Sequence, residues 1–214
     1  MKRLTSGAAV VMMSLLAGCT GTDEPSTSST PSSPATASMT DEEAHRKVPI
    51  DGTDAVPITW ESLESPESEQ VLAARRSLAF LYWERSETDW TPIIPIARHL
   101  VTEKHFQEVY EPFAGVTDFE DPLRGPLWIK LMGVEKTSPD VVRVNFCTDR
   151  GYWLRVKDEA KVREDPANLE SIVVKLVQTG DGEPRWLTDM QIDNAGDRAD
   201  QYGAQCTAWA KHKP

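Results

Sequence analysis

The stretch LWIKLMGVEKTSPDVVRVNFC, residues 127–147, decides the fold class of this chain. Its apolar residues recur at every second position, which is the period of a strand with one face turned to a core. Two alternating runs, 127–132 and 142–147, flank Ser138-Pro139-Asp140, whose residue types favour a turn. The stretch therefore predicts two antiparallel strands joined as a hairpin.

The same period continues toward the C-terminus. Residues 172–176 and 186–192 predict a third and a fourth strand, joined across Gly180-Asp181-Gly182. Earlier in the chain the period is helical. Ser65-Pro66-Glu67 has the residue types of a helix start, and apolar residues then recur at helical spacing until about Glu87, with two shorter helices expected before Pro122. Helices followed by strands predict an α+β domain, with helices on one face of an antiparallel sheet of about four strands.

The N-terminus has the three parts of an export signal. Lys2 and Arg3 precede a short apolar run that ends in small residues just before Cys19. The tetrad Leu16-Ala17-Gly18-Cys19 resembles a lipobox, in which the cysteine receives a diacylglyceryl group and the chain is cleaved before it. The alternative is an ordinary secretory signal that happens to precede a cysteine. We expect residues 1–18 to be removed, and Cys19 to anchor the mature chain by lipid at the extracytoplasmic face of the cytoplasmic membrane.

Composition divides the mature chain into three segments. Residues 19–40 are rich in Ser, Thr and Pro and nearly free of large apolar side chains, so we expect a disordered tether. Residues 41–65 remain acidic but gain a few apolar residues, which predicts an irregular lead-in that docks as a strand or loop. Residues 66–209 contain the periodic segments and predict one globular domain.

Charge and motifs exclude several classes of function. The formal net charge is −11, and loss of Lys2 and Arg3 with the signal leaves 21 basic residues against 34 acidic ones, a net charge of −13. Phosphate backbones attract Lys and Arg clusters, so a nucleic acid is not an expected partner. Motifs for serine hydrolases, dinucleotides, P-loops and zinc proteases are absent from the sequence. The acidic loop 118–121 lacks EF-hand spacing, and His99 and His105 would face apart on a helix, so neither a metal nor another cofactor is expected.

The two cysteines that remain are Cys147 and Cys206. An even pair in an oxidising compartment indicates a disulfide, with two buried free thiols as the alternative. Cys147 is out of phase with Val144 and Phe146, so its sulfur should leave the main core face and hold the C-terminal segment.

Five short segments carry a resemblance to a known family. They are Tyr82-Trp83, residues 90–100, residues 144–149, Arg185-Trp186-Leu187 and Cys206. Over about residues 66–206 the chain resembles the NTF2-like (cystatin-like, cone-shaped) superfamily, in the version carried by actinobacterial lipoproteins. The resemblance implies a curved sheet wrapped against helices, with a cavity between them. It implies no catalytic residue, because that fold hosts isomerases, dehydratases and binding domains alike.

A cavity of this kind is often lined by aromatic side chains. Core packing is the favoured interpretation of the seven tryptophans. The ligand-binding candidates are Tyr82, Trp83, Trp128 and Trp186. We therefore expect a non-enzymatic domain that binds a small apolar ligand or an envelope protein.

The alternative is a small cavity enzyme of the isomerase or dehydratase kind. Proton transfer would need a buried carboxylate near a tyrosine. The sequence offers several candidates, and no spacing favours one pair: the carboxylates are Glu135, Asp149 and Asp189, and the tyrosines are Tyr82, Tyr110 and Tyr152.

Cys19→Ser should abolish lipidation, because only the thiol forms the diacylglyceryl thioether. Metabolic labelling with a fatty acid should mark the parent and not the variant, and the variant should leave the membrane fraction, since two or more acyl chains are needed for stable anchoring. Equal labelling of both chains would show that Cys19 is not the lipidated residue.

Overall fold

A computed structural model describes residues 39–63, 67–158, 162–179, 182–193 and 198–214. The predicted signal, Cys19 and most of the predicted tether lie outside the described residues, as do Ser65, Pro66, Gly180 and Asp181. Contacts divide the chain into two units, Met1–Ala37 and Ser38–Pro214, and everything below concerns the second unit.

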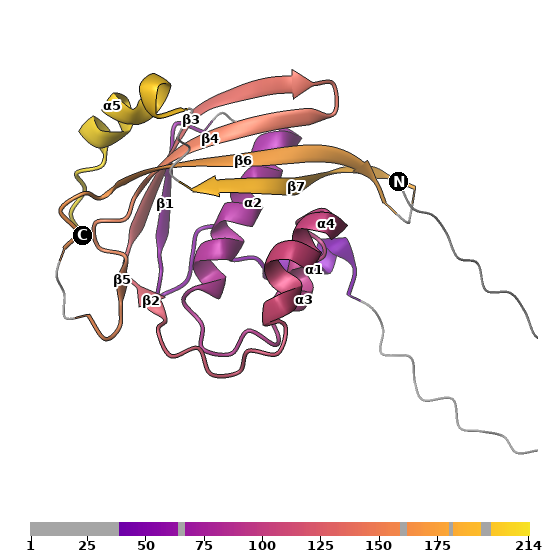
Figure 1. Cartoon of the computed structure of the whole chain (residues 1–214), viewed down its shortest axis with the longest axis horizontal. Coiled ribbons are helices and arrows are strands. Elements are labelled where there is room, and N and C mark those ends of the chain that lie inside the picture. The colour runs from indigo at the N-terminus through magenta and orange to yellow at the C-terminus, as the bar shows by residue number, and fades with distance from the viewer. Residues whose placement is uncertain (1–38, 64–66, 159–161, 180–181, 194–197) are drawn as a thin grey trace, which may run out of the picture. The chain divides into compact units, whose positions relative to one another are not determined.

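Within the described residues, seven strands form two sheets. They are β1 (Ile58–Glu61), β2 (Leu123–Arg124), β3 (Leu127–Ser138), β4 (Val141–Asp149), β5 (Leu154–Arg155), β6 (Ala167–Gln178) and β7 (Pro184–Asp193). The main sheet has the order β1-β3-β4-β6-β7, and β2 pairs with β5 in a small second sheet (Figure 1). β1 is parallel to β3, and the other neighbours in the main sheet are antiparallel. The predicted α+β class is confirmed.

The main sheet has one strand more than the sequence predicted. The additional strand, β1, lies in the segment 41–65 that was expected to be an irregular lead-in. It has four residues and pairs only with β3, so it is too short to show a clear period. The hairpin predicted across Ser138-Pro139-Asp140 is present between β3 and β4.

The helical segments range from one long helix to single turns. They are α1 (Asp41–Lys47), α2 (Glu69–Glu84), α3 (Ile94–Ala97), α4 (Glu103–His105), a π-helical turn η1 (Phe106–Tyr110), a 3-10 turn η2 (Glu111–Phe113) and α5 (Ala199–Trp209). None of the helices in the described ranges combines the length and apolar character that a membrane span requires.

Local capping explains where the first two helices begin. The Thr40 hydroxyl accepts from the Glu43 amide while the Glu43 carboxylate accepts from the Thr40 amide, a capping box that starts α1. The expectation of an irregular lead-in was therefore wrong here, although the pattern Thr-x-x-Glu was visible in the sequence. Ser68 caps α2 by accepting from the Val71 amide at 3.3 Å, so this helix begins slightly later than Ser65-Pro66-Glu67 predicted.

The core lies between α2 and one face of the main sheet. Alternation directs Val144 and Phe146 of β4, and Ile172 of β6, toward α2, and all three are fully buried. From α2, Leu78 and Tyr82 are also fully buried against this inner face. Figure 1 shows α2 crossing the sheet, with α3 and α4 beside it.

The opposite, outer face of the sheet carries α5. Cys147 and Cys206 are bonded with a Cα–Cα separation of 5.4 Å, and with Leu169 they form a small cluster apart from the main core. Figure 1 shows α5 on the side of the sheet away from α2. α5 was not expected from the sequence, because its polar composition and Gly203 give it a weak helical signal.

The bond between Cys147 and Cys206 should stabilise the domain chiefly by holding α5. With a sequence separation of 59 between the cysteines, the chain-entropy model gives about 4 kcal/mol of stabilisation. Reduction should lower the melting temperature and increase hydrogen exchange in α5 before it does so in α2. Alkylation and intact-mass analysis of the unreduced protein should detect no free thiol at either position, and two alkylated cysteines would refute the bond.

Candidate functional site

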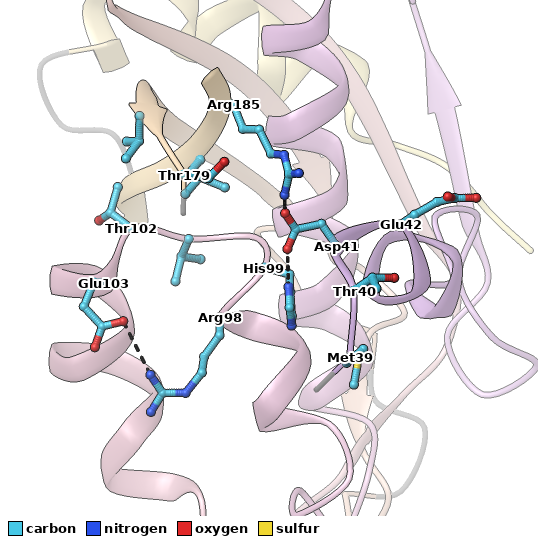
Figure 2. Close-up of a pocket in the computed structure, with 13 residues that line it drawn as sticks. Met39, Thr40, Asp41, Glu42, Arg98, His99, Thr102, Glu103, Thr179 and Arg185 are labelled. Carbon is cyan, nitrogen blue, oxygen red and sulfur yellow. Dashed lines mark hydrogen bonds and ion pairs between the residues drawn. The ribbon is translucent and has the colours of Figure 1, made fainter. Parts of the chain in front are cut away.

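A hollow of about 770 Å³ lies where α1 meets the segment from Arg98 to Glu103 and the ends of β6 and β7. Figure 2 shows Asp41 at its centre, with its carboxylate between the imidazole of His99 and the guanidinium of Arg185. Arg98 pairs with Glu103 at 3.4 Å. These charged side chains are thus paired with one another, which makes this hollow the weaker candidate for a ligand site.

A second cavity, of about 450 Å³, lies between the C-terminal part of α2 and the end of the sheet where β7 finishes. Its apolar wall consists of Leu81, Val109, Leu123 and Trp153. Its polar wall consists of Arg85, His105, Arg150, Gln191 and Asp193. These nine residues are called the cavity wall below. They come from α2, α4, η1, β2, the segment after β4, and β7, so the cavity exists only in the folded chain.

A buried polar cluster fixes Arg150 in this wall. Its Nη2 lies 3.0 Å from Glu170 Oε1 and 3.1 Å from Asp193 Oδ1, and its Nε donates to the Tyr82 hydroxyl at 3.1 Å. The Tyr82 hydroxyl in turn donates to Glu170 Oε1, which also accepts from Thr148 at 2.7 Å. Tyr82 and Glu170 at the centre of this network are fully buried, and the network connects α2 to three strands or strand ends.

The electrostatics of the cluster keep Tyr82 neutral and Arg150 charged. Burial raises the pKa of Tyr82 well above its usual value, and the adjacent Glu170 raises it further. Burial alone would lower the pKa of Arg150, but Tyr82, Glu170 and Asp193 around it raise the pKa above its usual value. The cluster therefore serves as a fixed support for a charged guanidinium in the wall.

Two residues of the cavity wall, His105 and Trp153, each have a buried side-chain nitrogen without a hydrogen-bond partner among the described residues, and His105 is the one of the two that can titrate. His105 is 7% exposed, and its Nε2 atom has no hydrogen-bond partner among the described residues. Burial lowers its pKa, with smaller opposing effects from Asp189 and Glu108, so the imidazole is neutral at neutral pH. A buried polar atom without a partner costs about 1–3 kcal/mol, and a bound molecule could remove that cost.

Four aromatic residues were predicted to bind a ligand, and the structure does not bring them together. Tyr82 lies in the buried cluster behind the cavity wall, while Trp83 packs edge-on against Phe80. Trp128 lies on the outer face and stacks on His212 with ring centroids 5.0 Å apart. Trp186 lines a separate hollow of about 270 Å³. The tryptophan in the cavity wall is Trp153, which meets Tyr82 edge-on with ring centroids 4.9 Å apart.

The carboxylates considered for proton transfer have other partners. Glu135 pairs with Arg198 at 2.6 Å, Asp149 pairs with His212 at 3.0 Å, and Asp189 accepts from Thr102 at 2.9 Å. In the acidic loop 118–121, Asp121 pairs with Arg155 and Lys157. His99 and His105 lie in different hollows. No group of three side chains able to hold a metal ion occurs among the residues that the structure describes.

The sequence did contain a signal for Glu170. This residue lies in β6 in the same alternation phase as Ile172 and Val174, so a charge was placed at a core position. Such a charge needs a buried partner, and a search for one could have led to Arg150. No comparable signal identifies His105, whose role depends on how three distant segments surround it.

Glu84 is a second buried carboxyl group, next to the cavity but outside its wall. It is 3% exposed, and burial raises its pKa from 4.5 to about 7 although Arg85 favours the charged form. Its charge also contributes, after burial, to raising the pKa of Tyr110.

Because the folded state holds the Glu84 proton more tightly than the unfolded state, the stability that this group provides is complete below about pH 4.5 and is lost as the pH rises through 7. Glu84→Gln should remove this loss. The variant should gain about 3 kcal/mol in unfolding free energy relative to the parent between about pH 4.5 and about pH 8, as measured by urea denaturation. Glu69→Gln, at an exposed position of the same helix, is the control. Parallel pH profiles of the parent and Glu84→Gln would contradict the assignment.

Comparison with known proteins adds no information about the site. The chain matches no protein-family model, no curated protein and no solved structure. The resemblance to the NTF2-like superfamily therefore stays a prediction, and the function has to be inferred from the geometry of this chain.

Proposed function

We propose that this protein is a lipid-anchored, extracytoplasmic, non-enzymatic binding protein whose NTF2-like domain holds a small, largely apolar molecule in the 450 Å³ cavity. The anchor is Cys19, and the tether that follows it gives the domain reach from the membrane surface. The main evidence for a ligand site is the unpartnered Nε2 atom of buried His105, in a wall that also contains several apolar side chains.

Cavity size and composition support a small molecule as the occupant. Ligand sites commonly measure about 300–1,000 Å³ and combine an apolar lining with a few fixed polar groups. Leu81, Leu123 and Trp153 supply the apolar lining here, and Arg150 is held in place by the cluster behind it. A cavity that remains open favours a small ligand over an envelope protein, which would require an apolar surface instead.

The alternative of a small cavity enzyme has less support. A general base needs a carboxylate or imidazole facing the substrate with a pKa near the working pH, and burial lowers the pKa of the His105 imidazole, which makes it a weaker base. The carboxylate in the cavity wall is Asp193, whose side chain is 58% exposed and whose Oδ1 is bound by Arg150 and Asn168. Glu170 is fully buried behind Arg150 and pairs with it. Binding is therefore the proposed function.

Filling the cavity should abolish binding without unfolding the domain. The unlipidated mature chain, secreted from an ordinary signal sequence with Ser in place of Cys19, should bind the neutral fluorophore N-phenyl-1-naphthylamine with a saturable increase in fluorescence. Val109→Trp should remove this binding, because the indole would occupy the cavity. Val109 is 38% exposed, so the substitution should leave the melting temperature nearly unchanged.

Val134→Trp provides the matched control. It makes the same substitution at a position on β3 that is 49% exposed and lies outside the cavity wall. This variant should bind the fluorophore as the parent does. No saturable binding by the parent, or equal binding by parent and Val109→Trp, would refute the cavity as the ligand site.

A further inference from the structure

The polar part of the cavity wall differs in charge from the chain as a whole. The full sequence has 34 acidic residues against 23 Lys and Arg. The wall reverses that balance, since Arg85 and Arg150 face a single carboxylate, Asp193, and His105 and Gln191 add uncharged polar groups. Two guanidinium groups in the wall of one cavity, in a protein that is acidic as a whole, favour a ligand that carries negative charge.

Arg150 presents one unused edge of its guanidinium. Its hydrogen bonds and ion pairs to Tyr82, Glu170 and Asp193 involve Nε and Nη2, and Nη1 bonds to no described residue. Because the buried cluster holds the group in one orientation, the Nη1 edge is available to a ligand at little cost in side-chain entropy. The charge of Arg150, however, is already balanced by the two carboxylates that bind it.

Arg85 is the guanidinium in the cavity wall whose positive charge is not balanced by an ion pair with a described residue. It is exposed, lies over the ring of Trp90 at 5.9 Å, and forms no ion pair with any residue in the described part of the chain. Arg85 follows the last residue of α2 as its C-cap, one position after buried Glu84, so its side chain reaches the cavity from the rim. A ligand anion at this rim would meet a guanidinium whose electrostatic neighbour Glu84 is buried and does not form an ion pair with it.

We infer that the ligand is a small monocarboxylate with an apolar body, its carboxylate bound by Arg85 and by donors from His105 Nε2 and Arg150 Nη1. This inference rests on the proposed function and specifies the ligand class. The apolar body packs against Leu81, Leu123 and Trp153, deeper in the same cavity. A guanidinium suits this role because its N–H groups match the two oxygens of a carboxylate. Buried His105 can direct an N–H toward the same oxygens and so satisfy its own Nε2 atom.

1-Naphthoate and 1-naphthamide have nearly the same size and shape but differ in charge, so comparing them isolates the effect of the charge on binding. In calorimetric titrations of the unlipidated mature chain, 1-naphthoate should bind about tenfold or more tightly than 1-naphthamide, since a hydrogen bond to a charged group contributes more than one to a neutral group. Arg85→Gln should reduce this preference to about twofold or less, mainly by weakening the binding of naphthoate. Arg85 is exposed, so the variant should keep the melting temperature of the parent.

Arg46→Gln is the matched control, because it removes an exposed arginine from a helix outside the cavity and should keep the full preference. If naphthoate and naphthamide bind the parent equally well, or if Arg85→Gln keeps the preference, the monocarboxylate inference is wrong while the binding function stands. If neither probe nor N-phenyl-1-naphthylamine binds the parent, the binding function itself fails and the inference fails with it.

Discussion

The buried ion pair between Arg150 and Glu170 holds together the end of the domain that contains the cavity. Glu170 is fully buried, its Oε1 lies 3.0 Å from Arg150 Nη2, and the same oxygen is bound by Tyr82 and Thr148. Removing one partner of a buried pair typically costs 3–5 kcal/mol, because the other charge is left uncompensated. Replacing such a pair by apolar residues is often neutral, so stability alone gives no reason for its presence. Its structural effect is to fix a guanidinium in the wall of a cavity.

This arrangement divides the inner face of the main sheet into two parts. Toward the β3–β4 hairpin, Val144 and Ile172 pack against α2 and close the core, while Thr148 and Glu170 at the other end are polar. The core does not extend to that end, and the space there becomes the 450 Å³ cavity. The outer face is covered separately by α5, which the bond between Cys147 and Cys206 attaches to β4. One face of the sheet therefore holds the site, and the other holds the covalent link that secures the C-terminal helix.

Much of the fold follows from local pattern, and the site does not. Alternation in residues 127–147 predicted β3, β4 and their hairpin, and the phase of Cys147 placed its sulfur away from the core. The segment expected to dock as a strand or loop contains β1, although its four residues were too few to count as a strand of the sheet, and α5 was not predicted because its polar composition and Gly203 give a weak helical signal. The aromatic residues selected as ligand contacts lie in the inner core, on the outer face and in another hollow. The presence of an aromatic residue in the sequence does not show which way its side chain points in the fold. His105 and Arg150 become a site only when α4 and the segment after β4 meet, and that contact is set by long-range packing.

The proposed function requires that the cavity receives a ligand whose oxygen accepts a hydrogen bond from His105 Nε2. The most direct measurement is a solved structure of the mature chain with 1-naphthoate present. It should place the naphthalene ring against Trp153 and a carboxylate oxygen within hydrogen-bond distance of His105 Nε2, about 2.7–3.2 Å, with Arg85 turned toward the same group. A cavity filled by collapsed side chains, or naphthoate bound elsewhere with His105 Nε2 still unpartnered, would contradict the account.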